Sequence, residues 1–100
     1  MADSGILIIA SATARPGKEA ELVAALREVA GPTRSQPGCI RFSLYRQQDA
    51  NATIVGIERW ASAGDHDRHL AGAHFQRLAS RMADLIAEPP RIVTYTVIDD

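Results

Sequence analysis

Cysteine and aromatic residues are scarce in this chain of 100 residues, and long hydrophobic runs are absent. The single cysteine, Cys39, cannot form an internal disulfide, and no second ligand stands beside it at the spacing of a metal or redox motif. The longest apolar run, residues 5–10, is far shorter than the roughly 20 residues that cross a membrane, and no basic segment precedes it as in a signal peptide. We therefore expect a cytoplasmic protein without a membrane partner.

An excess of either charge is also missing. The 11 Lys and Arg residues nearly balance the 12 Asp and Glu residues, and they are spread along the chain without a basic run. Because binding to nucleic acid depends on a concentrated positive surface, we expect no nucleic-acid partner. What the chain does contain is 46% hydrophobic residues, which at this length predicts one globular domain spanning residues 1–100.

Hydrophobic periodicity predicts four strands and two helical regions. The strands are expected at residues 6–14, 39–47, 53–60 and 92–98. The helical regions are expected at residues 18–30, where Gly31 and Pro32 should weaken or end the helix, and at residues 62–87, where Gly72 should break it. The resulting order is β-α-β-β-α-β. It predicts an α+β, ferredoxin-like fold with helices on one face of a four-stranded antiparallel sheet.

The first and last predicted strands carry apolar residues on both faces, although the helices can cover only one face. Apolar sheet surface left in water marks an interaction surface. A domain of this size also gains stability by associating with a second copy. We therefore expect a homodimer packed through its sheet faces with two-fold symmetry.

Side chains suited to chemistry are concentrated in the third predicted strand and the helical region after it. The strand carries Glu58 and Trp60, and the helical region holds all three histidines. Histidine titrates near neutral pH, so His69 and His74 are candidate general bases. Two structural alternatives stay open: His69 as a partly buried histidine bonded to the backbone, and His74 as a helix cap.

Glu58 and Trp60 also admit both a functional and a structural interpretation. Glu58 either acts as a base or orienter for a histidine, or is the structural partner of an arginine. Trp60 is either a flat wall for an aromatic ligand or an anchor of the core. Arg41 and Tyr45 share a face of the second strand and are candidates to bind a substrate oxygen, or else dimer-interface or rim residues. Phe75, beside His74, is a further candidate for the substrate pocket.

Four segments, in this order and spacing, resemble the antibiotic biosynthesis monooxygenase (ABM) family. They are Thr13-Ala14-Arg15-Pro16-Gly17-Lys18-Glu19, Pro32-Thr33-Arg34-Ser35-Gln36-Pro37-Gly38-Cys39, Glu58-Arg59-Trp60, and His69-Leu70 with His74-Phe75. The resemblance implies a dimeric α+β barrel built from two ferredoxin-like subunits. It also implies a monooxygenase that oxidises a small phenolic, quinol or polyketide-like aromatic compound with molecular oxygen, without a bound metal, flavin or haem.

The haem-degrading branch of the same superfamily uses an Asn, a Trp and a His at positions that correspond here to Ala10, His69 and Ala79. None of the three is kept, so haem is not expected. A metal site at His66 and His69 is not expected either, because no further ligand completes it at a recognisable spacing. Two alternatives to an enzyme stay open on the same fold. One is a non-catalytic ligand-binding or stress-response dimer, and the other is a structural partner-binding module without a cavity.

Overall fold

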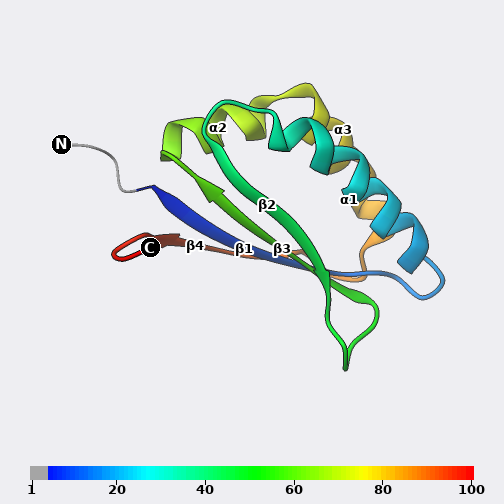
Figure 1. Ribbon diagram of the computed structural model, residues 1–100. Helices are drawn as coiled ribbons and strands as arrows, with labels where there is room; N and C mark the ends of the chain where they lie inside the picture. The colour runs from blue at the N-terminus through cyan, green and yellow to red at the C-terminus, as the bar shows by residue number, and fades with distance from the viewer. Residues whose placement is uncertain (1–4) are drawn as a thin grey trace.

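Seven elements follow one another along residues 5–100, the part of the chain that the computed structural model describes (Figure 1). In chain order they are β1 (Ile6–Thr13), α1 (Glu19–Arg34), β2 (Cys39–Arg46), β3 (Thr53–Trp60), α2 (Ala63–Ala71), α3 (Ala73–Leu85) and β4 (Arg91–Thr96). The predicted ferredoxin-like order is confirmed, and Gly72 divides the second helical region into α2 and α3 as expected.

The four strands form one antiparallel sheet in the order β2-β3-β1-β4. All three helices lie on one side of this sheet (Figure 1). In the register, Glu58 of β3 is opposite Ile8 of β1 and Phe42 of β2. Because side chains alternate along a strand, Glu58 and Trp60 share the face that the helices cover.

Helix α1 runs through Arg34, so the prediction that Gly31 and Pro32 weaken or end it was wrong. Pro32 lies in the last turn, where the missing N–H removes only one helical hydrogen bond. The turn is held by Thr33, whose hydroxyl is buried and donates to the carbonyl oxygen of Val29 at 2.6 Å. The longer helix places Gln36 in the connection directly after it.

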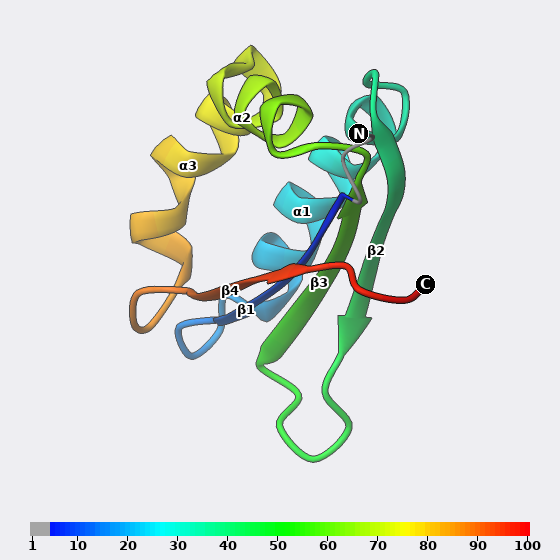
Figure 2. The ribbon, with the colours of Figure 1, turned by 90° about the vertical axis from the view of Figure 1, so that its left-hand side faces the viewer.

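The core lies between α1, α3 and the inner face of the sheet. Helix α1 packs on β2, and α3 packs beside α1 (Figure 2). The buried side chains of this cluster include Leu22 and Val29 of α1, Phe42 and Ile54 of the sheet, and Leu78 of α3. This packing fixes α1 against the sheet and leaves α3 to cover the remainder of the inner face.

The outer face of the sheet is also largely apolar. Ile9 of β1 pairs with Ile57 of β3 on one side and with Val93 of β4 on the other, so the three side chains form a row across the sheet. Tyr45 and Tyr95 are each 45% exposed. Within residues 5–100, no helix covers this face (Figure 1). Among the helices of the same part of the chain, none combines the length and apolar character needed to cross a bilayer.

Candidate functional site

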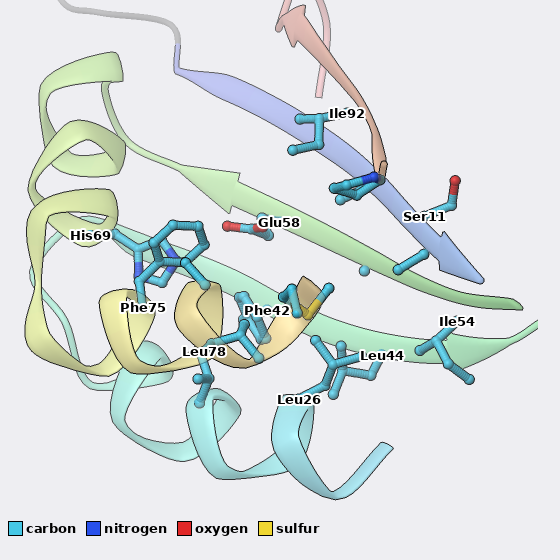
Figure 3. Close-up of a pocket in the computed structure, with 17 residues that line it drawn as sticks. Ser11, Leu26, Phe42, Leu44, Ile54, Glu58, His69, Phe75, Leu78 and Ile92 are labelled. Carbon is cyan, nitrogen blue, oxygen red and sulfur yellow. The ribbon is translucent and has the colours of Figure 1, made fainter. Parts of the chain in front are cut away.

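A cavity of about 350 Å³ lies between the inner face of the sheet and helices α1 to α3 (Figure 3). Its walls are mostly Ala, Leu, Ile, Phe and Met side chains. Of the lining residues in the described part of the chain, only Glu58 and His69 are ionisable. The cavity is within the size range of small-molecule sites. The absence of a cavity, which would have favoured a purely structural module, is therefore not observed.

Glu58 reaches the cavity from near the C-terminal end of β3 (Figure 3). Its Oε1 accepts a hydrogen bond of 2.9 Å from the indole nitrogen of Trp60. Burial raises the pKa of the Glu58 carboxyl, and the hydrogen bond from Trp60 offsets part of the rise. Within residues 5–100 the carboxyl has no arginine partner, so the ion-pair interpretation does not hold. A carboxyl in this setting is a stronger base than one in water.

Trp60 is fully buried and does not line the cavity, so the interpretation as a core anchor holds and the interpretation as a wall for a ligand was wrong. The indole stacks on the imidazole of His69, with ring centroids 5.0 Å apart and planes inclined by 29°. Because it also donates to Glu58, Trp60 supports both ionisable residues of the cavity from behind. The sequence indicated the right strand face for Trp60 and left open whether the ring lies in the core or in the cavity wall.

His69 lines the cavity from the end of α2 and is 3% exposed. Its Nδ1 lies 2.8 Å from Oε1 of Gln36, so its partner is a side chain rather than the backbone. Phe75 packs edge-on against the imidazole, with ring centroids 5.3 Å apart, and lines the cavity (Figure 3), and its contact with a substrate stays a prediction. Burial, followed by the charge of His66, lowers the pKa of His69 from 6.5 to about 4. The ring is therefore neutral at physiological pH.

His74 lies outside the cavity. It is exposed at the start of α3 and borders a separate groove with Arg77 and Arg81. It does not cap the helix either, because the N-cap residue is Gly72 and no side-chain capping bond is formed. Both roles predicted for His74 were therefore wrong. A helical turn of 100° per residue directs Phe75 rather than His74 to the cavity.

Arg41 and Tyr45 lie on the outer face of the sheet, where a guanidinium nitrogen of Arg41 donates to the hydroxyl of Tyr45. Neither lines the cavity, so their predicted contact with a cavity ligand was wrong. The alternation along β2 predicted that Arg41 and Tyr45 lie on the same face of the strand, which is correct. The alternation alone does not tell which face of the sheet the helices cover. The interface interpretation of these two residues stays a prediction.

Gln36 is the residue of the site that the sequence did not indicate. It belongs to the connection after α1 and meets His69 across 33 positions of sequence. Two residues so far apart in sequence form no local pattern from which their contact could be predicted. Ala10 and Ala79, which stand where haem-degrading relatives carry an Asn and a His, both line the cavity with methyl side chains. Among residues 5–100, no group of three or more His, Cys, Asp or Glu side chains is placed to hold a metal ion.

Fold and site together define a ferredoxin-like α+β domain with an apolar cavity and one buried carboxyl beneath its helices. The sequence profile described as "Antibiotic biosynthesis monooxygenase" matches residues 5–81. The chain therefore belongs to the ABM family.

Similar proteins cover nearly the whole chain. The structure of Rv0793 from Mycobacterium tuberculosis shares 27% identity and superposes with a TM-score of 0.93, covering 97% of this chain and 98% of that one. Protein SO0527 from Shewanella oneidensis shares 29% identity with a TM-score of 0.88, covering 93% and 90% of the two chains. The uncharacterized protein sll1783 of Synechocystis sp. is 28% identical over 98% of this chain and 67% of its own length.

Proposed function

We propose that this protein is a cofactor-independent monooxygenase that oxidises a small phenolic, quinol or polyketide-like aromatic compound with molecular oxygen. The observation that carries the proposal is the position of Glu58, a carboxyl of raised pKa that faces an apolar cavity of about 350 Å³. Membership of the ABM family supports the same conclusion. No cofactor is part of the proposal.

The reaction begins with removal of a proton from the bound aromatic compound by Glu58. Ground-state oxygen reacts slowly with closed-shell molecules, and the anion formed by deprotonation gives up an electron far more readily than its neutral parent. The anion combines with oxygen to form a peroxide anion, which takes back the proton from Glu58 and so becomes a hydroperoxide. Loss of water from a CH–OOH carbon then leaves a carbonyl, so that one oxygen atom enters the product and the other leaves as water.

The remaining side chains bind and orient the aromatic compound. Phe75 and Phe42 present ring surfaces to the cavity, and aromatic rings favour edge and offset contacts with such surfaces. Trp60 holds one oxygen of Glu58 in place. His69 is a weak base because its pKa is about 4, so it serves as a neutral hydrogen-bond partner rather than as the principal base.

The proposal is tested by oxygen uptake of metal-stripped protein with anthrone or a naphthalenediol as substrate. Glu58→Gln preserves shape and an acceptor for Trp60 but removes the base, so uptake should fall by about 10² to 10⁴. Glu88→Gln, at an exposed position outside the cavity, is the matched control and should keep the wild-type rate. Uptake by the Glu58→Gln variant at the control rate would contradict the assignment of the base.

A non-catalytic ligand-binding protein is the second candidate, and the scarcity of polar groups in the cavity wall favours it. It predicts saturable quenching of Trp60 fluorescence by aromatic ligands through the stacked His69, without product formation. Turnover that disappears in Glu58→Gln while quenching persists would decide for the enzyme.

We also propose that two copies associate through the outer faces of their sheets as a dimeric α+β barrel. The row of Ile9, Ile57 and Val93 supports this, because an apolar row left in water is unfavourable. Tyr45 and Tyr95 extend the same apolar surface. A second copy presents a self-complementary surface, which a two-fold axis satisfies.

A further inference from the structure

The two ionisable residues of the cavity each keep one polar atom without a protein partner. Oε1 of Glu58 is bound to Trp60, which leaves Oε2. Nδ1 of His69 is bound to Gln36, which leaves Nε2. Among the described residues, the only side-chain nitrogen or oxygen that is both buried and unpaired is Nε of Arg59, so Oε2 and Nε2 both reach open space. Since both residues line the cavity and His69 is almost fully buried, that space is the cavity.

Gln36 determines whether Nε2 of His69 donates or accepts. A neutral imidazole carries one proton, and the nitrogen bonded to an acceptor carries it. Oε1 of Gln36 accepts from Nδ1, so Nε2 has a lone pair and no proton. The neutral state follows from the lowered pKa of His69.

The position of Gln36 is fixed through its backbone. Its N–H donates to the carbonyl oxygen of Thr33 at 3.0 Å, and its own carbonyl oxygen accepts from the N–H of Cys39 at 3.1 Å. The side chain thereby reaches His69 with its oxygen, Oε1, at 2.8 Å from Nδ1.

The lining offers no side-chain donor to balance these acceptors. In the described part of the chain it contains no Arg, Lys, Asn, Gln or Tyr. The hydroxyl of Ser11 points away from the cavity (Figure 3). With Glu58 ionised, a ligand therefore meets two acceptors in an otherwise apolar space, and a ligand group that can only accept would leave both of them unpaired.

We propose that Gln36 is a specificity-determining residue: it holds His69 as the Nδ1–H tautomer, so that the cavity selects aromatic ligands with hydroxyl donors over the corresponding carbonyl forms. The site thus prefers a dihydroxy aromatic compound to its quinone. In the proposed reaction, which consumes hydroxylated rings and forms carbonyls, the same preference favours release of the product. The binding preference itself requires no oxygen chemistry, so it can be tested without turnover.

The test compares 2,3-dimethyl-1,4-naphthoquinone with its quinol by calorimetric titration under argon. The titration is run at several pH values from about 6 to about 9, because the raised pKa of Glu58 makes its carboxylate form more favoured as pH rises. At the upper end of this range wild type should bind the quinol at least about tenfold more tightly than the quinone. Gln36→Met removes the acceptor while keeping the length of the side chain, and should reduce the preference severalfold. Gln36→Glu restores an acceptor and should restore the preference, and Gln47→Glu, at an exposed position, is the control.

Nitrogen-15 NMR of the His69 ring measures its tautomer directly. The tautomer would not change if Gln36 only stabilised the fold. Wild type and Gln36→Glu should show the Nδ1–H pattern, and Gln36→Met should shift toward Nε2–H, the form that free histidine prefers. An Nε2–H ring in wild type, or a folded Gln36→Met protein with the full preference, would overturn the proposal. If Gln36→Met does not fold, the wild-type spectrum and the quinol preference of wild type decide. Absence of oxygen uptake would refute the monooxygenase without affecting these measurements.

Discussion

The indole nitrogen of Trp60 donates a hydrogen bond of 2.9 Å to the carboxyl of Glu58, two residues earlier on the same strand. Residues two apart on a strand point to the same side, so β3 itself brings this donor and acceptor together. The bond fixes one oxygen of the carboxyl and moderates the pKa rise that burial causes. The proposed base is therefore positioned by its own strand.

Replacement of Glu58 by Gln should stabilise the protein increasingly as pH rises. The folded-state pKa of Glu58 is raised, so the unfolded chain releases this proton first. The wild-type stability from this group is full below the unfolded pKa, near 4.5, and is lost as pH rises through the folded value. Thermal unfolding of wild type and Glu58→Gln, compared from about pH 5 to about pH 8, should show a difference that grows with pH. A difference independent of pH would contradict the buried carboxyl.

Acid should destabilise the protein through His69. Its pKa is lowered from 6.5 to about 4 on folding. At pH values between these two, the imidazole is protonated in the unfolded chain but not in the folded protein. Stability is full above about 6.5 and decreases toward pH 4, by up to about 3 kcal/mol from this group.

His69→Phe should remove that part of the acid sensitivity, because the ring stays among Trp60, Phe42 and Phe75 without a titrating group. Denaturant unfolding at several pH values measures the effect in both proteins. NMR titration of His69 in wild type is the direct check. A midpoint near 6.5 would show that burial does not depress its pKa.

Gly38→Ala should destabilise the protein far more than Gly17→Ala. Both glycines have positive φ, 84° and 82°, so each substitution costs about 1 kcal/mol of backbone strain. A Cβ on Gly38 would in addition collide with the carboxyl group of Asp65, whereas nothing lies near Gly17. Chemical denaturation of the two variants isolates the steric part. Equal losses would mean that Asp65 moves aside freely.

Ile57→Asp should convert the proposed dimer to a monomer. It places a charge in the row formed with Ile9 and Val93 on the outer face of the sheet. Ile40→Asp is the control, because Ile40 is the irregular position of β2, outside that row, and is already 60% exposed. Light scattering should give twice the monomer mass for wild type and the control. A monomeric wild type would remove the basis for a sheet-to-sheet interface.

Much of the fold follows from local patterns. Alternation on β3 grouped Glu58 with Trp60 correctly, because a period of two is a property of the strand alone. The end of α1 was predicted too early, because Pro32 is tolerated in the last turn of the helix. The side-chain hydroxyl of Thr33 stabilises that turn through its hydrogen bond to Val29. That compensation depends on a tertiary environment in which the Thr33 hydroxyl is buried.

The site was less predictable than the fold because its contacts are non-local. Arg41 and Tyr45 form a polar row that the pattern of β2 shows clearly, yet only packing decides that the row faces away from the helices. His74 was predicted at the site, but the next residue of the helix, Phe75, is the one that lines the cavity. Gln36 meets His69 through the path of the chain after α1, which no spacing of residues encodes.

The alternation of β3 has a consequence for how this protein can diverge. Even-numbered positions such as Glu58 and Gly56 border the cavity, and odd-numbered positions such as Ile57 and Val55 belong to the opposite face. If the cavity binds a ligand and the outer face forms the dimer, as proposed above, neighbouring residues of β3 are under separate selection, one for the ligand and one for the interface. Single substitutions one residue apart would then change the ligand while the dimer is kept, or the reverse.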